Sequence, residues 1–392
     1  MARIQEFYKG RRKRRNYAIV PFVIMLGLAA LLVVTFYGMQ QYAVITSDGV
    51  SVRFPMFDEG DDNTVADSLG HERHVFERVE TQLVFDEPDY SRIQATAGRY
   101  MTGIRAIFVP YTDLTSEKIS EYTSRLRLGN ALVLEMKPRS GLLMWNSQSD
   151  AARGYGLAVT AEQSAVVERI IQDLKENPPN GKDIYLAAQI SCCIDELYPS
   201  RSTSVALRTE LGLNYSDDKG TWLDPYNADL RNYVVQMVRE LYDMGFDEVI
   251  LADVEHPTAP EVNGEKINFV YSRDMSTTPN PVTAICGFAV SVAQQLSDRD
   301  GALSIYCTKP QALVRADEVN GQDAVLFMKL YDRVYYATDT GTYTNYNLKD
   351  IEDNVTIGSA RIRFVPVLTN YLFSDAGDTR QSWVLVDAPT GE

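Results

Sequence analysis

From about residue 100 to the end of the chain, apolar and polar positions follow two alternating patterns. Short apolar runs with the length of buried strands occur at eight places, namely 104–109, 131–136, 184–190, 249–254, 303–307, 334–337, 362–368 and 383–386. Between several of these runs, apolar residues recur every three or four positions, which predicts helices over 116–127, 161–175, 228–244 and 282–296. Strands that alternate with helices predict a parallel sheet covered by helices.

Eight such strands within residues 100–392 fit an α/β fold, the (β/α)8 TIM-type barrel. The alternative is an open, doubly wound sheet, in which a glycine-rich phosphate loop commonly follows the first strand. Residues 109–112 are instead Val-Pro-Tyr-Thr, so we predict the barrel. The chain ends at Glu392, too soon after the last run for an eighth helix, and we expect residues 50–99 to cover that gap.

One long apolar segment precedes this region. Residues 17–37 contain no charged side chain, and a helix of this length rises about 31 Å, close to the thickness of the hydrocarbon core of a bilayer. A cleaved signal peptide would have a shorter apolar core and small residues at its cleavage site, whereas residues 35–39 are Thr-Phe-Tyr-Gly-Met. We therefore predict an uncleaved transmembrane signal-anchor helix over residues 17–39.

The charges before this segment predict its orientation. Residues 11–15 are Arg-Arg-Lys-Arg-Arg, and a basic flank favours the cytoplasmic side of a membrane. We expect residues 1–16 to form a basic cytoplasmic tail, 40–99 an extracellular linker or N-terminal extension, and 100–392 an extracytoplasmic barrel. The expected localisation is the cell membrane, crossed once, and the short basic N-terminus is typical of a bacterial protein.

Composition narrows the range of partners. Apolar residues make up 45% and charged residues 23% of the 392, which is typical of a folded protein. The formal net charge of −15 makes nucleic acid a poor partner, because phosphate neutralisation drives that binding. Four cysteines are too few for a disulfide scaffold. We expect them to be buried as small apolar groups, or to form one disulfide between Cys193 and Cys307.

Two sets of motifs resemble a known family. Residues 221–226 are TWLDPY, and 245–249 are GFDEV in a stretch that ends at Pro257. Residues 103–107 and 130–137 add GIRAI and NALVLEMK. Over about residues 100–388 the chain resembles the bacterial "Putative glycosyl hydrolase domain" family. The resemblance implies a (β/α)8 barrel related to retaining glycosidases, commonly exported and anchored in a membrane.

The chain departs from the pattern that the resemblance implies. The family aspartate on the fourth strand falls on Ala252, and the family arginine after it falls on Glu255. Gln189 replaces an arginine on the third strand and Glu135 an aspartate on the second, while Lys137 is kept. The sixth-strand motif at 334–339 is also different, although the aspartate before it, at 332, is present. The scaffold is therefore retained while much of the implied site is changed.

Acidic residues at strand ends are the candidates for catalysis. Active groups of such barrels lie at the C-terminal ends of strands, and glycoside hydrolysis needs a protonated carboxyl group and an ionised one. The candidates are Glu135, Asp195, Asp253, Glu255, Asp332, Asp339 and Asp387. The preferred pair is Asp253 or Glu255 with Glu135 or Asp332. For any single acid, a solvated loop carboxylate or a helix N-cap is the more common role, and a part in a polar site is favoured only for the set.

The direction of Asp253 depends on where its strand ends. Side chains alternate between the two faces of a strand, so if Ala252 faces the pocket, Asp253 faces away unless the strand ends or bulges there. Glu255 lies beyond the strand and is free to turn inward.

Aromatic and polar residues near strand ends are the candidates for substrate binding. Sugar rings have an apolar face that stacks on aromatic side chains; the aromatic candidates are Tyr111, Trp145, Trp222, Tyr226, Tyr306, Tyr335 and Tyr336, and the polar ones are Lys137, Gln189, His256 and Arg363. For the aromatic residues, packing in the core is the alternative, and Asp224-Pro225 also fits a plain helix start. His256 is either a general base or a structural loop residue.

Two functions remain open at this stage. The first is a membrane-anchored, extracytoplasmic glycoside hydrolase-like barrel acting on a cell-wall or extracellular polysaccharide. The second is a catalytically inactive barrel that binds glycan or has a structural role at the cell surface, and a different hydrolysis is a weaker third. The spacing Asp253-Glu255-His256 matches no zinc pattern, so we expect no metal and no other cofactor.

Overall fold

The computed structural model describes residues 43–46, 49–52, 103–126, 129–262, 265–272, 280–308, 316–338, 363–369 and 382–386. The chain divides into two compact units, Met1–Val84 and Phe85–Glu392. The described part of the first unit is one antiparallel hairpin of β1 (Ala43–Thr46) and β2 (Gly49–Val52). The predicted membrane segment 17–39 lies outside the described residues, and among those described no helix is long and apolar enough to span a membrane.

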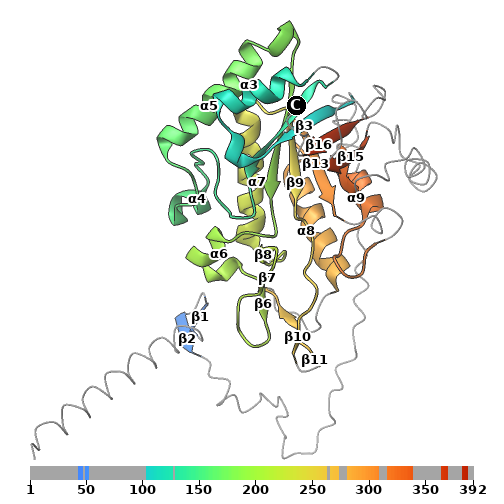
Figure 1. Ribbon diagram of the computed structural model, residues 1–392. Coiled ribbons are helices and arrows are strands. Elements are labelled where there is room, and N and C mark those ends of the chain that lie inside the picture. The colour runs from blue at the N-terminus through green and yellow to red at the C-terminus, as the bar shows by residue number, and fades with distance from the viewer. Residues whose placement is uncertain are drawn as a thin grey trace, which may run out of the picture. The chain divides into compact units, whose positions relative to one another are not determined.

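The second unit contains a closed barrel of eight parallel strands (Figure 1). In chain order they are β3 (Arg105–Val109), β4 (Ala131–Lys137), β5 (Tyr185–Ser191), β9 (Glu248–Ala252), β13 (Ala302–Cys307), β14 (Arg333–Thr338), β15 (Phe364–Thr369) and β16 (Trp383–Val386). Each strand pairs with the next in this order, and β16 closes the ring on β3 with Val384 opposite Ala106. All eight predicted strands are present, so the TIM-type barrel is confirmed and the open sheet is excluded.

Strand β4 shows why these segments are nearly continuous apolar runs. Ala131 and Val133 pack in the barrel interior, whereas Leu132, Leu134 and Met136 pack in the shell between the barrel and its helices. A strand buried on both faces needs apolar side chains at successive positions, as is usual in parallel sheets. The two polar residues near its end are therefore exceptions placed at the C-terminal end of the barrel.

Helices connect the strands and cover the barrel. Those between strands are α3 (Ser116–Ser124), α4 (Asp150–Tyr155), α5 (Ala161–Glu176), α6 (Leu197–Arg201), α7 (Ala228–Asp243), α8 (Pro281–Gln295) and α9 (Ala324–Leu330). Their starts follow the sequence: Thr160 and Gln163 form a capping box, and Asn227 and Asn280 accept N–H bonds at the first turns of α7 and α8. The four predicted helices are confirmed to within a few residues.

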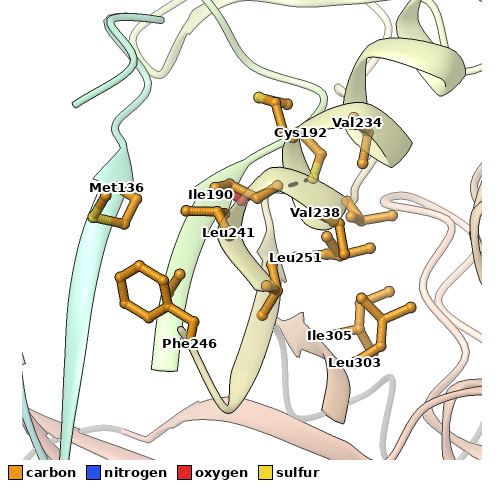
Figure 2. Packing of buried hydrophobic residues seen from close by; sticks show 14 of the residues in the cluster. Met136, Ile190, Cys192, Val234, Val238, Leu241, Phe246, Leu251, Leu303 and Ile305 are labelled. Atoms are coloured by element: carbon orange, nitrogen blue, oxygen red, sulfur yellow. Dashed lines mark hydrogen bonds between the residues drawn. The ribbon is translucent and has the colours of Figure 1, made fainter. Parts of the chain in front are cut away.

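Helix α7 shows how the helices are fixed to the barrel. Val234, Val238 and Leu241 lie on one face of this helix, one turn apart, and pack near Leu251 and Ile305 of the strands (Figure 2). All five side chains are fully buried. Packing of this kind holds the strands in a fixed register, which positions the side chains at their ends.

The connections after β5 and β9 carry short pairs of antiparallel strands at one end of the domain (Figure 1). Their paired strands are β6 (Arg208–Thr209) with β12 (Phe269–Val270), β7 (Ser216–Asp217) with β8 (Gly220–Thr221), and β10 (Glu261–Val262) with β11 (Glu265–Lys266). Trp222 centres a separate apolar cluster here with Leu207 and Phe269. Residues 50–99 were expected to cover the gap left by the missing eighth helix. Beyond Val52 these residues lie outside the described part of the chain.

The four cysteines are unpaired. Cys192, Cys193 and Cys307 are buried in the main core, where burial raises the pKa of each thiol. Figure 2 shows Cys192, whose Sγ lies 3.7 Å from the carbonyl oxygen of Ile190. The disulfide between Cys193 and Cys307 was therefore the wrong alternative, and three of the four cysteines are buried while Cys286 is partly buried.

Candidate active site

A cavity of about 500 Å³ lies at the C-terminal ends of the barrel strands. Apolar side chains of the strands line its floor, including Val133, Ile250 and Val384. Polar side chains line its upper part; they are Glu135, Lys137, Arg139, Ser140, Gln189, Ser191, Asp253, Tyr306 and Thr308. This is the end at which barrels of this type carry their active groups.

Asp253 reaches the cavity because strand β9 ends one residue before it. The strand ends at Ala252, and Asp253 has a φ of 53°. This left-handed conformation is uncommon for residues other than glycine, although aspartate and asparagine tolerate it. The change of backbone direction breaks the alternation of the strand, so Ala252 and Asp253 both line the cavity. Backbone strain of this kind is concentrated at functional sites.

Two side chains hold the Asp253 carboxylate. Arg139 Nε lies 3.1 Å from both carboxylate oxygens and its Nη2 lies 2.6 Å from Oδ1. Ser191 Oγ donates to Oδ2 at 2.7 Å. Asp253 is buried, whereas the Arg139 side chain is 46% exposed. The carboxylate is therefore oriented by charge-assisted bonds from the loop after β4 and from the end of β5.

Glu135 provides a second carboxyl group in the same cavity. Burial raises its pKa, and the negative charge of Asp253 raises it further, against the lowering effects of the Tyr111 backbone N–H and of Arg139. The backbone N–H of Tyr111 donates to Glu135 Oε2 at 3.1 Å. Glu135 therefore keeps its proton to a higher pH than an ordinary glutamate, next to a carboxylate that is paired with a cation. Two carboxyl groups with opposed environments are the arrangement that acid–base chemistry requires.

Lys137 lines the cavity but its ammonium group is engaged elsewhere. Its Nζ donates to the carbonyl oxygen of Ser191 at 2.8 Å and forms an ion pair of 2.8 Å with Asp195. Both partners of the pair are fully buried. Gly141 packs directly on this aspartate, because a Cβ there would lie 2.0 Å from Oδ1. The pair therefore ties the C-terminal end of β4 to the loop after β5.

Three of the predicted aromatic residues line the cavity. Tyr111 and Tyr306 lie at its wall, and the ring of Tyr335 faces its interior. The hydroxyl of Tyr335 donates to Glu248 at 2.9 Å, so only the ring is available to a ligand. Gln189, which the family resemblance placed at the site, also lines the cavity.

The other predicted aromatic residues lie away from the cavity. Trp222 and Tyr226 belong to the separate cluster near the hairpins, and Trp145 Nε1 donates to Glu240 on α7 at 2.7 Å. Tyr336 packs in the outer shell, with its ring centroid 5.6 Å from that of Phe364. For Trp222 and Tyr336 the subsite interpretation was wrong, because both are buried among apolar side chains.

Glu255 is buried beside the cavity but does not line it. Lys219 of the β7–β8 hairpin pairs with it at 2.6 Å, and the Thr308 hydroxyl donates to it at 2.7 Å. Its charge is therefore satisfied within the protein, which makes it a support for the hairpin rather than a free acid. Candidates Asp339 and Asp387 lie outside the described residues.

His256 is a structural residue in this geometry. Its Nδ1 lies 2.7 Å from the carbonyl oxygen of Pro257 and its Nε2 lies 2.7 Å from the Tyr271 hydroxyl. It is buried and does not line the cavity. Burial lowers its pKa from 6.5 to about 4. The general-base interpretation is therefore disfavoured, and the structural alternative agrees with the contacts.

The buried His256 predicts a pH dependence of stability. Because its pKa falls from 6.5 to about 4 on folding, its contribution is complete above pH 6.5 and is lost as the pH falls towards 4. The expected loss is about 3 kcal/mol of unfolding free energy. Urea unfolding between pH 7 and pH 4 measures it, and His256→Asn should show a flatter curve. Parallel curves for the variant and the wild type would contradict the assignment.

Asp332 and Arg363 lie at the opposite end of the barrel. Asp332 precedes β14, pairs with Arg299 at 2.9 Å and accepts the N–H of Leu303 at 2.8 Å. Arg363 precedes β15 and donates to the carbonyl oxygens of residues 328, 331 and 332. In a parallel barrel the residue before a strand lies at its N-terminal end. Both site predictions were therefore wrong, because both residues make their contacts at the N-terminal end of the barrel.

Four polar cavity residues were not among the predicted site residues: Arg139, Ser140, Ser191 and Thr308. Arg139 stands two residues after β4 and Ser191 is the last residue of β5, so their position at strand ends was the available signal. Arg139 and Ser191 contact Asp253, and Thr308 contacts Glu255. Each of these contacts joins segments that are distant in the sequence. Among the described residues, no group of three or more His, Cys, Asp and Glu side chains is placed to hold a metal ion.

The family model described as "Putative glycosyl hydrolase domain" matches residues 106–337, which is more than half of the chain. The chain belongs to this family. The match runs from β3 to β14 and includes Glu135, Arg139 and Asp253, so this putative glycosyl hydrolase domain holds most of the cavity. No curated protein matches the chain.

Several solved structures are similar to this chain, at low sequence identity. The glycoside hydrolase domain of PgaB (BpsB) from Bordetella bronchiseptica is 11% identical, with a TM-score of 0.50, over 72% of this chain and 94% of that one. A hypothetical protein from Ruminiclostridium thermocellum is 21% identical, with a TM-score of 0.42, over 51% and 96%. The glycoside hydrolase domain of PelA from Pseudomonas aeruginosa is 10% identical, with a TM-score of 0.40, over 73% and 96%.

Proposed function

We propose that this protein is a glycoside hydrolase that cleaves a polysaccharide in the cavity at the C-terminal end of its barrel. The observation that carries the proposal is the pair of carboxyl groups in one cavity: Glu135, whose pKa is raised, and Asp253, which is held by Arg139. Membership of a glycosyl hydrolase family supports the same chemistry.

The two carboxyl groups have different roles in this proposal. Glu135, whose pKa is raised by burial, donates a proton to the glycosidic oxygen as the bond breaks. Asp253 is the ionised carboxylate that attacks the sugar carbon or activates a water molecule. Arg139 and Ser191 keep the carboxylate in place. The rings of Tyr111 and Tyr306 offer faces on which a sugar can stack.

We also propose that the protein acts at the cell surface. The apolar segment 17–39 with its basic flank supports a single membrane anchor with a cytoplasmic N-terminus. The barrel would then meet a cell-wall or extracellular polysaccharide. Protease treatment of intact cells tests this location, because a barrel on the outer side is digested and a cytoplasmic one is protected.

A second candidate function is glycan binding without hydrolysis. The observation that favours it is the Arg139 guanidinium, which contacts both oxygens of Asp253. A carboxylate held in this way is a weaker nucleophile, and Ala252 stands where the family resemblance implies an aspartate.

Release of reducing sugar distinguishes the two functions. The purified full chain is incubated with a panel of polysaccharides that includes peptidoglycan, and binding to each is measured in parallel. Hydrolysis that is lost in Glu135→Gln and kept in Glu255→Gln supports the enzyme, since Glu255 is a buried glutamate outside the cavity. Binding without hydrolysis supports the second function.

A further inference from the structure

The side-chain amide of Gln189 lies in the barrel cavity beside the proposed acid. Gln189 stands on β5 opposite Glu135 of β4, and it is half-buried where it lines the cavity. Among the described residues, no side chain or backbone group bonds to this amide. The neighbouring Glu135, Ser191 and Asp253 side chains, in contrast, are all hydrogen-bonded within the protein. The donor and the acceptor of Gln189 are therefore open to a molecule in the cavity.

The surface next to this amide is apolar. On β9, the strand beside β5, Ile250 pairs with Gln189 and Ala252 pairs with Ser191. Ile250 and Ala252 both line the cavity, and Ala252 presents only a methyl group. Neither side chain has a polar atom, so a hydroxyl group placed against them would lose its bonds to water without replacement.

Gln189 and Ala252 both depart from the residues that the family resemblance implies. The resemblance implies an arginine at 189 and an aspartate at 252, whereas this chain has an amide and a methyl group there. Two opposite charges on neighbouring strands are thus replaced by two neutral groups. This side of the cavity therefore suits a neutral substituent that has one polar part and one apolar part.

We propose that the cavity selects a sugar that carries an acetamido group, as in an N-acetylhexosamine. The amide of the acetamido group bonds to Gln189, and its methyl group packs against Ala252 and Ile250. A hydroxyl group in the same place leaves the apolar surface uncovered, and an ammonium group loses its hydration against it. The proposal rests on the proposed function for the position of the sugar beside Glu135, but the binding preference does not require hydrolysis.

Saturation-transfer NMR and titration of the full chain test this preference, in the Glu135→Gln background so that no probe is hydrolysed. The probes are the methyl glycosides of N-acetylglucosamine and N-acetylgalactosamine, and the comparisons are those of glucose, galactose and glucosamine. We expect at least one acetamido sugar to bind more tightly than its hydroxyl counterpart, within the range of about 10–200-fold that one methyl-sized apolar contact provides. The acetamido methyl group should receive the strongest saturation from the protein.

Two variants test the two halves of the acetamido contact. Gln189→Leu removes the amide at nearly constant volume and should weaken binding of the acetamido sugar about tenfold. Its melting temperature should not fall, because no described group bonds to the Gln189 amide. Ala252→Val fills the space for the methyl group, so the acetamido sugar should bind no better than the hydroxyl sugar. Gln172→Leu, on the exposed surface of α5, is the matched control and should leave binding unchanged.

Failure of the proposed function is seen separately from failure of this inference. If the wild type releases no reducing sugar from any polysaccharide while the acetamido preference is present, only the hydrolysis is contradicted. The inference is overturned by no binding of either acetamido sugar, or by equal or tighter binding of the hydroxyl or amino sugars. A preference that is unchanged in either folded variant, Gln189→Leu or Ala252→Val, also overturns it.

Discussion

Glu135→Gln is expected to lower kcat on the hydrolysed polysaccharide by about 10²–10⁴-fold, the range that general acid catalysis contributes. Glutamine keeps the size of the side chain and its bond to the Tyr111 N–H, but it has no proton to give to the leaving oxygen. KM should change little, because the variant retains the shape of the cavity. A raised KM with an unchanged kcat would instead make Glu135 a residue that binds the substrate.

The pH dependence of kcat provides an independent check on this role. A general acid works in its protonated form, and the pKa of Glu135 is raised by burial and by Asp253. Activity should therefore persist above the pH at which an ordinary glutamate ionises, and fall as the pH rises through the raised pKa. In Asp253→Asn the residual activity should fall at lower pH, since one cause of the raised pKa is removed. Asparagine is the suitable replacement because it tolerates the positive φ.

Arg333→Met is expected to lower the free energy of unfolding by about 3–5 kcal/mol, the usual cost of breaking a buried ion pair. Arg333 Nη1 lies 2.7 Å from Glu248, and both side chains are fully buried within the barrel. The variant leaves the carboxylate with only the hydroxyls of Tyr185 and Tyr335, each 2.9 Å away. Most domains have a total stability of about 5–15 kcal/mol, so this loss is large. Urea unfolding measures it.

The double variant Arg333→Met with Glu248→Met is the control for this prediction. It removes both charges, so it should be more stable than either single variant. It should not reach the wild type, because the hydroxyls of Tyr185 and Tyr335 then lose their acceptor. A loss below 1 kcal/mol in Arg333→Met would show that the carboxylate finds another partner or takes up a proton.

The fold was predictable because both faces of each barrel strand are buried. Apolar runs such as 131–136 and 303–307 are visible in the sequence for this reason. Helix starts were also visible, since Asn227 and Asn280 are caps with a local signal. The buried pair of Arg333 and Glu248 had no such signal, because these residues lie 85 positions apart and meet only after the barrel closes.

The site was predictable only in part. Glu135 was predicted from its place at a strand end and Gln189 from the family resemblance, and both line the cavity. Asp332 and Arg363 were misplaced although the sequence held the answer, since a residue before a strand lies at the N-terminal end of the barrel. The ion pair of Arg139 with Asp253 depends on a loop conformation and on a strand that ends at Ala252, which no local pattern reveals.

The positive φ of Asp253 has a consequence for how relatives of this chain are sorted. The resemblance implies an aspartate at 252, so a comparison that scores each motif position separately finds Ala252 and counts a lost acid. The change of backbone direction at Asp253 places a carboxylate in the same cavity from the next position of the motif. Surveys that divide such barrels into active and inactive members by one column would place this chain in the wrong group if the proposed chemistry holds. Scoring the two columns together with the backbone angle would avoid that error.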